Sequence, residues 1–155
     1  RWTWQEASDL ASASEHQGMQ GHLVTITSQE ERNFITDTFH SVLRNGLFPK
    51  TIWLGGFQDT DAAGVLDGWN WVTGEAWGGY TEWASGQPNN LDQNYLAWAY
   101  LSTSPARGWH DTPVDYKFWA DEPVAYIVEY EAVPVPASFL LLGAGLCVIA
   151  RLKHE

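Results

Sequence analysis

The feature that most constrains the fold is a change of sequence pattern near residue 45. Before this point, residues 2–16 and the segment that begins at Ser28 place apolar residues at helical spacing. After it, short apolar or aromatic runs alternate with Gly, Asn and Asp, which is typical of strands joined by turns. Two early helices followed by strands that do not alternate with helices predict an α+β domain rather than a doubly wound parallel sheet.

Both expected helices begin with a capping box, in which a Ser or Thr side chain and a Glu three residues later satisfy free backbone N–H groups. The pattern is T-W-Q-E at Thr3 and S-Q-E-E at Ser28. In the second helix, the apolar residues Ile35, Phe39 and Val42 fall on one stripe. We therefore expect two amphipathic helices that pack against the strands.

Five short runs rich in aromatic and β-branched residues are the expected strands. They cover residues 22–26, 51–54, 69–72, 94–100 and 124–130. Residues 73–93 and 101–123 are long for connections within a compact domain, and loops of that length usually carry function. We expect the functional site on these two loops.

The charge balance excludes one class of partner. The formal net charge is -11, with 8 Lys and Arg against 19 Asp and Glu, so the chain lacks the basic face that a nucleic-acid binder needs. An acidic chain favours solubility, cation binding or neutral partners such as sugars. The only cysteine, Cys147, lies in an apolar C-terminal run, so the folded part has neither a disulfide nor a thiol nucleophile.

Tryptophan is abundant, and its placement leaves two interpretations open. Six of the ten tryptophans lie between Trp69 and Trp109. Aromatic rings form cores, and they also line sugar and peptide sites. We expect most of these rings to be core, with a few at the site.

The sequence gives little support for catalysis. It contains no G-x-S-x-G, Walker or H-E-x-x-H pattern, and His16, His22, His40 and His110 do not cluster. We therefore expect a binding protein, not an enzyme.

Nine fragments of the chain, taken in order, resemble a C-type-lectin-like domain. They are W-T-W-Q-E-A, G-H-L-V-T-I, S-Q-E-E-R-N-F-I, W-L-G-G, W-N-W-V-T-G-E, Y-T-E-W-A-S-G-Q-P-N-N, N-Y-L-A-W, G-W-H-D and A-Y-I-V-E-Y. The resemblance covers residues 2–131, which we take as one domain of a bacterial, disulfide-free type. It implies two helices packed on a small antiparallel sheet with long loops.

The resemblance also implies a metal site. In sugar-binding members, a cis bond before the proline equivalent to Pro88 fixes a turn, and a calcium ion binds the residues around it together with sugar hydroxyls. The corresponding positions here are Gln87, Asn89, Gln93, His110 and Asp111.

This sequence departs from the sugar-binding pattern at most of these positions. Imidazole is a poor ligand for calcium, so His110 drops out and the metal set becomes Gln87, Asn89, Gln93 and Asp111. Only Asp111 keeps a carboxylate, and calcium affinity depends on the number of charged ligands. Calcium is therefore a candidate cofactor with a reduced ligand set.

Whether calcium binds at this turn stays open. Asp92 or Asp115 could supply the missing charge. Otherwise Asp111 holds a loop by accepting backbone N–H bonds, and the segment at residue 88 survives as a turn only.

The expected function is non-catalytic recognition of an extracellular carbohydrate or surface glycan, with calcium as the candidate cofactor. Gln87, Asn89 and Asp111 form its expected polar centre, and Trp83 or Trp109 its apolar platform. The alternative is a metal-independent protein-binding or adhesion module on the same fold.

A second acidic loop begins like an EF-hand, with Asp59, Asp61 and Gly64 at the first, third and sixth places. Ala63 then occupies the fifth place, which needs an oxygen ligand, and Asn70 the twelfth, which needs a bidentate Glu. The sequence favours a solvated turn here.

The C-terminal part is expected to lie outside the domain. Residues 132–137 read as a Pro-rich linker, and residues 138–155 as a hydrophobic helix with a basic end, whose apolar run is shorter than the about 20 residues of a full span. The segment V-P-V-P-A with this run resembles the PEP-CTERM sorting signal of Gram-negative bacteria, with Val135 in place of the usual glutamate. That resemblance implies export, transient membrane anchoring, processing by an exosortase-type enzyme, and location at the cell surface or in the extracellular matrix.

Overall fold

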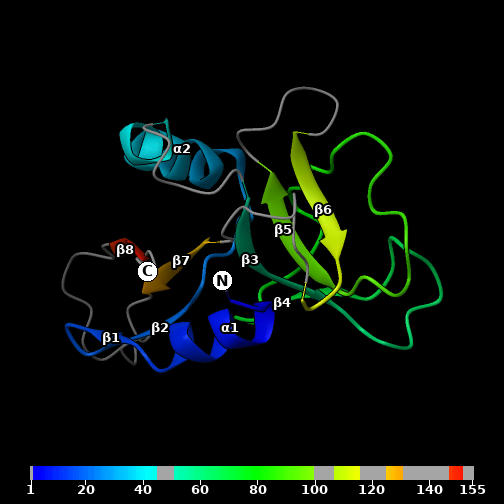
Figure 1. Ribbon diagram of the computed structural model, residues 1–155, viewed down its shortest axis with the longest axis horizontal. Helices are drawn as coiled ribbons and strands as arrows, with labels where there is room; N and C mark the ends of the chain where they lie inside the picture. The colour runs from blue at the N-terminus through cyan, green and yellow to red at the C-terminus, as the bar shows by residue number, and fades with distance from the viewer. Residues whose placement is uncertain (1, 45–50, 100–106, 116–124, 131–146, 152–155) are drawn as a thin grey trace, which may run out of the picture.

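The computed structural model describes residues 2–44, 51–99, 107–115, 125–130 and 147–151. Helix α1 covers Trp4–Ser12 and helix α2 covers Gln29–Arg44. The strands are β1 (Glu15–His16), β2 (Met19–Leu23), β3 (Ile52–Gln58), β4 (Trp69–Trp71), β5 (Tyr95–Ala99), β6 (Gly108–Thr112), β7 (Ala125–Tyr130) and β8 (Cys147–Arg151). The two helices lie apart on opposite faces of a twisted sheet, and long loops gather beside β5 and β6 (Figure 1). The expected α+β class is confirmed.

The described strands follow the order β1-β2-β7-β3-β5-β6, with β4 added to β3 and β8 to β7. Strand β7, late in the chain, lies between the early strands β2 and β3. It pairs antiparallel with β2 and parallel with β3, where Ile52 faces Ala125. The sheet is therefore mixed and not purely antiparallel as expected. The long connection between β3 and β7 makes the parallel pairing possible, because only antiparallel strands can be joined by a tight turn.

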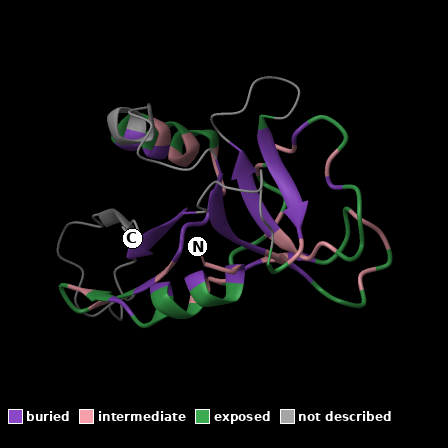
Figure 2. Cartoon of the chain, in the orientation of Figure 1, coloured by how far each residue is buried: buried purple, intermediate pink, exposed green. Residues whose placement is uncertain are grey.

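The core lies on both faces of the sheet. Alternate residues of β3 point to opposite faces, so Ile52 and Leu54 join one buried cluster while Trp53 joins the other. The first cluster includes Ile35 and Phe39 of α2, and the second includes Trp4, Ala7 and Ala11 of α1. Figure 2 shows the buried strands at the centre and the exposed outer side of α1.

Most described tryptophan rings belong to this core, as expected. Trp53, Trp98 and Trp109 are fully buried. The indole N–H groups of Trp4 and Trp53 donate hydrogen bonds to backbone oxygens: Trp4 Nε1 to Leu54 O at 2.8 Å, and Trp53 Nε1 to Trp2 O at 3.0 Å.

Both predicted helix starts are confirmed. Thr3 Oγ1 accepts from Glu6 N at 3.1 Å, and the Glu6 carboxylate accepts from Thr3 N at 2.8 Å. At α2, Ser28 Oγ accepts from Glu31 N at 3.1 Å, and the Glu31 carboxylate accepts from Ser28 N at 3.2 Å. These contacts satisfy backbone groups that the helices leave free at their N-termini.

The two long segments behave differently. Within residues 73–93, backbone pairing is limited to an isolated bridge between Trp83 and Trp109. The other segment, 101–123, contains β6, which the sequence pattern did not predict because Gly108, His110 and Asp111 interrupt any apolar run there.

The expected hydrophobic helix at 138–155 is wrong for Cys147–Arg151, which form strand β8 antiparallel to β7. Because β2 already pairs with Val128, Glu129 and Tyr130, β8 pairs with these residues along the opposite edge of β7, the edge that β3 uses at Ala125 and Tyr126. The β-branched pair Val148 and Ile149 suits this placement. The linker at 132–137 and the rest of the expected helix lie outside the described residues. Within the described ranges, no helix has both the length and the apolar character that a membrane crossing needs.

We predict that Thr3→Ala lowers the free energy of unfolding by about 1 kcal/mol, because it removes the oxygen that accepts the Glu6 N–H. Thr3→Ser keeps a hydroxyl and should stay within about 0.5 kcal/mol of the original protein. Urea denaturation measures both. Equal stability of the Ala and Ser variants would contradict the role of the cap.

Candidate functional site

The turn predicted around residue 88 is present. Gly86 has φ +80°, a conformation that favours glycine, and the bond between Gln87 and Pro88 is cis. Gln87 N donates to Ala84 O at 3.0 Å, which closes the turn. Pro88 is buried and Asn89 is exposed, so the turn points its tip toward solvent.

Asp111 of β6 holds the segment that follows this turn. Its Oδ2 accepts from Asn89 N and from Asn90 N, both at 2.8 Å. The Asp111 side chain is buried, at 3% exposure, and it is the acceptor that fixes two consecutive amides of a loop. The structure therefore brings the turn and β6 together. Asp111 Oδ2 holds the loop by accepting backbone N–H bonds, as one of the sequence interpretations expected.

The preceding part of the loop packs on the same strand. Trp109 N donates to Glu82 O at 2.7 Å, and Ala84 N donates to Trp109 O at 3.0 Å. Gly108 has φ +135°, and a Cβ there would lie 2.6 Å from Glu82 O. Glycine at 108 is needed for the loop to approach β6 this closely.

Two buried oxygens at this junction have no hydrogen-bond partner among the described residues: Asp111 Oδ1 and Gln87 Oε1. Oxygen ligands are what calcium prefers, so the residues suit this ion in kind. They offer a single carboxylate, and the described ranges hold no group of three or more His, Cys, Asp or Glu side chains that could bind a metal. The described residues therefore supply two oxygens of the kind that calcium prefers but only one negative charge to hold it.

The other sequence-predicted residues lie at different depths. Gln93 is partly buried, while Asp92 and Asp115, the two possible sources of extra charge, are exposed. His110 is buried and pairs with Ala97 of β5. Of the two tryptophans proposed as an apolar platform, Trp109 is fully buried and therefore belongs to the core. Trp83 is partly exposed.

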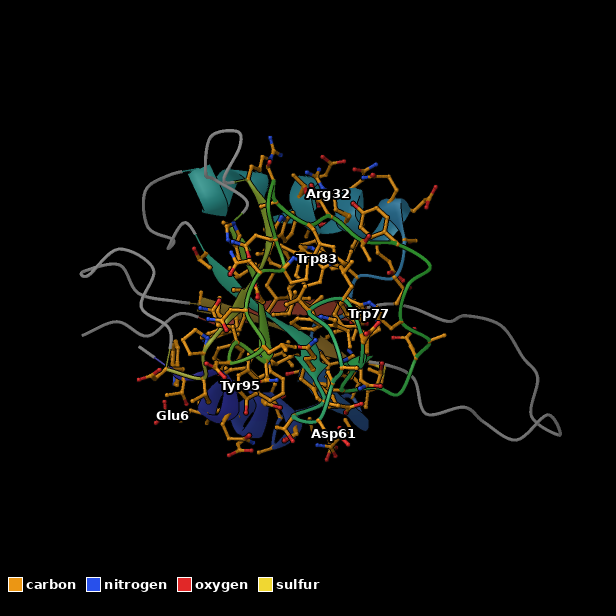
Figure 3. All side chains as sticks on the ribbon, turned by 90° about the vertical axis from the view of Figure 1, so that its right-hand side faces the viewer. Glu6, Arg32, Asp61, Trp77, Trp83 and Tyr95 are labelled. Atoms are coloured by element: carbon orange, nitrogen blue, oxygen red, sulfur yellow. The ribbon has the colours of Figure 1, made fainter. Side chains whose placement is uncertain are left out.

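Aromatic rings anchor the loop to the core. Trp77 stacks on Trp69 at 5.5 Å between ring centroids and lies 4.7 Å from Trp71. Trp83 meets Trp109 edge to face at 5.9 Å. Figure 3 shows Trp77 and Trp83 close to the middle of this side of the molecule, below Arg32. A loop with little regular pairing is thus held by packing.

One interaction beside the site was not predicted. Arg32 of α2 and Glu82 of the loop form a two-pronged pair, with Nε to Oε2 at 3.1 Å and Nη2 to Oε1 at 3.0 Å. The hydrogen bond to Glu82 raises the pKa of Arg32. The two residues are 50 positions apart, so no local pattern could have revealed their contact.

Tyr80 extends this pair. Its hydroxyl donates to Glu82 Oε2 at 3.3 Å, and its ring meets Trp109 edge to face at 5.8 Å. Burial raises the pKa of Tyr80 to about 12, and the negative charge of Glu82 adds to the rise.

The acidic loop after β3 is closed by side-chain hydrogen bonds. Asp59 Oδ1 accepts from Asn70 Nδ2 at 3.1 Å, and the buried Gln58 donates through Nε2 to Gly64 O and Asp67 O at 3.0 and 2.7 Å. These contacts fit the expected turn.

A family model described as the Lectin C-type domain matches residues 2–119. Halomucin of Haloquadratum walsbyi is 33% identical over 138 residues, which cover 80% of this chain and 1% of that protein. The C-type lectin lectoxin-Lio1 of Erythrolamprus poecilogyrus is 32% identical over 91 residues, which cover 59% of this chain and 50% of that protein. The chain thus spans half or less of these relatives.

Solved structures share the fold. The C-type lectin CEL-I of Cucumaria echinata has a TM-score of 0.56 at 21% identity, covering 72% of this chain and 75% of that one. Human lithostathine has a TM-score of 0.57 at 22% identity, covering 76% and 73%. The C-type lectin domain of murine dendritic cell inhibitory receptor 2, solved in complex with N-glycan, has a TM-score of 0.52 at 25% identity, covering 73% and 74%.

We predict that Asp111→Asn lowers the free energy of unfolding by about 2 to 3 kcal/mol, because hydrogen bonds to a charged acceptor contribute about 1.5 to 3 kcal/mol each. Asp115→Asn, at an exposed carboxylate beyond the end of the same strand, is the control and should change stability by less than about 0.5 kcal/mol. Chemical denaturation compares the two. Similar stabilities for both variants would show that Asp111 does not hold the loop.

Proposed function

The chain belongs to the C-type lectin domain family, and on that premise we propose that it binds an extracellular carbohydrate or surface glycan. The family and its fold are those of non-catalytic carbohydrate-binding modules, so the expectation of a binding protein rather than an enzyme is confirmed. The proposed site is the surface formed by the turn at 87–89, residue Gln93 and Asp111.

The contact of Asp111 with the loop carries this proposal. With Oδ2 committed to Asn89 N and Asn90 N, the turn is fixed before any ligand arrives. The affinity cost of ordering a loop is thereby reduced. Oδ1 of the same carboxylate and Gln87 Oε1 have no partner among the described residues.

The side chains around the turn suit sugar hydroxyls. An amide both donates and accepts hydrogen bonds, as a hydroxyl does, so Gln87, Asn89 and Gln93 can each engage a sugar without a net charge. Trp83, partly exposed and packed on the buried Trp109, is the proposed apolar platform. The murine receptor domain that was solved in complex with N-glycan supports a glycan as the ligand class.

Calcium enters the proposal as a weakly bound cofactor. The residues that would hold it are Asp111 through Oδ1, Gln87 through Oε1, and the amide oxygens of Asn89 and Gln93. When bound, the ion would supply a positive charge that attracts hydroxyl oxygens. With one carboxylate, a dissociation constant of about 1 mM is expected, at the weak end of extracellular sites.

A glycan array tests the proposal. We expect binding to a subset of glycans that weakens without disappearing when EDTA replaces about 10 mM calcium, and about 1.4 kcal/mol of added stability in calcium. Gln87→Ala and Asn89→Ala should each lower glycan affinity about tenfold, since each loses a hydrogen bond. Asp61→Asn, on the exposed turn after β3, is the control and should bind normally. Glycan binding that both alanine variants retain in full would place the site elsewhere.

The second candidate is a metal-independent protein-binding or adhesion module on the same surface. This candidate is favoured because the metal ligand set contains a single carboxylate, that of Asp111. One of its two oxygens, Oδ2, already accepts hydrogen bonds from the loop. An array without glycan binding in either buffer, together with unchanged stability in calcium, would favour this candidate.

Export and a surface location belong to the same proposal. They rest on the V-P-V-P-A segment and the apolar run that ends in Arg151, Lys153 and His154, which resemble a bacterial PEP-CTERM signal. We expect an exosortase-type enzyme to process the chain near residues 133–137, after transient anchoring, and to release it to the cell surface or matrix. Intact mass spectrometry of the exported protein measures this, and a full-length mass would contradict it.

A further inference from the structure

The loop that carries the proposed site is tied to helix α2 by a single ion pair. Arg32 and Glu82 are the only Lys or Arg to Asp or Glu pair among the residues that the structure describes. Both side chains are largely buried, at 15% and 25% exposure. A two-pronged Arg–carboxylate pair fixes direction as well as distance, which a single ammonium contact does not.

Arg32 contacts Glu82 and Trp98, two residues that pair with Trp109. Its guanidinium pairs with the side chain of Glu82, whose backbone oxygen accepts from Trp109 N at 2.7 Å. The same guanidinium lies 5.5 Å from the centroid of the Trp98 ring. Trp98 is the residue that faces Trp109 across the β5–β6 pair. Arg32 therefore acts on Trp109 indirectly, through Glu82 and Trp98.

Trp109 stands two residues before Asp111 on β6, so the two side chains point to the same face of the sheet. Asp111 in turn fixes Asn89 N and Asn90 N. Contacts thus run from α2 through Glu82 to Trp109, and strand β6 joins Trp109 to Asp111, which holds the turn.

We propose that Arg32 is a positioning residue of the candidate site, acting through Glu82 and Trp98 on Trp109 and thereby on the turn held by Asp111. The functional meaning of this role rests on the proposed function, while the coupling itself is a property of the fold. Tyr80 supports the arrangement, since it donates to the same carboxylate and packs its ring on Trp109.

Amide hydrogen exchange of the full chain measures this coupling directly. In Arg32→Lys, which keeps the charge but loses the fork, and in Glu82→Gln, which keeps the shape but loses the charge, the amides of Trp109, Asn89 and Asn90 should exchange about tenfold faster. The amides of Gly21 and Val24, bonded to Ser14 O and Ile127 O on the far side of the sheet, should not change.

Thr3→Ala is the matched control, because it weakens the fold at α1, away from the loop. It should not accelerate the three site amides selectively. Equal acceleration of all five amides in the Arg32 and Glu82 variants would mean that the pair only stabilises the fold, and unchanged exchange at the site would mean that it does not act there. Either result overturns the proposal.

The exchange experiment uses no glycan, so its outcome is separate from that of the array. Selective acceleration with no glycan binding would leave the positioning role in place and end the carbohydrate proposal. Glycan binding together with equal acceleration of all five amides would support the carbohydrate proposal and end the positioning role of Arg32.

Discussion

The candidate site depends on how the loop at 73–93 pairs with one residue of β6. Trp109 donates through N to Glu82 O and accepts through O from Ala84 N, while its ring is fully buried in the core. Backbone groups of a loop need partners once they leave water, and this strand provides them. Because Asp111 follows on the same strand, the register that satisfies the loop also delivers a carboxylate to the turn.

The sequence predicted the local features well because they depend on neighbouring residues. The capping boxes at Thr3 and Ser28 join residues three positions apart, and the turn at Pro88 is formed by four consecutive residues. Features that depend on distant residues were missed. Strand β6 contains Gly108, His110 and Asp111, which are buried only through their long-range partners, and Arg32 contacts Glu82 across 50 positions. The parallel pairing of β3 and β7 likewise follows from where a late strand is inserted, which periodicity does not encode.

For Asp111, the two sequence interpretations turn out to be compatible. A carboxylate has two oxygens, and here Oδ2 binds the loop while Oδ1 has no partner among the described residues. One side chain can thus hold the turn through Oδ2, while the proposed cation contact would use Oδ1. The cost is charge: a carboxylate whose negative charge is already shared with two amide dipoles attracts a cation less than a free one does.

This division explains why amides suit the rest of the site. In a chain of net charge -11, a cluster of carboxylates would need a bound cation to offset their repulsion. Gln87, Asn89 and Gln93 remove that requirement while keeping the oxygens. The charged contacts that order the loop are then Asp111 at the turn and the ion pair between Glu82 and Arg32 earlier in the loop. In the proposed site, the groups that order the loop therefore differ from those that contact the ligand: the ion pair and Asp111 fix the loop, and the neutral side chains are the proposed ligand contacts.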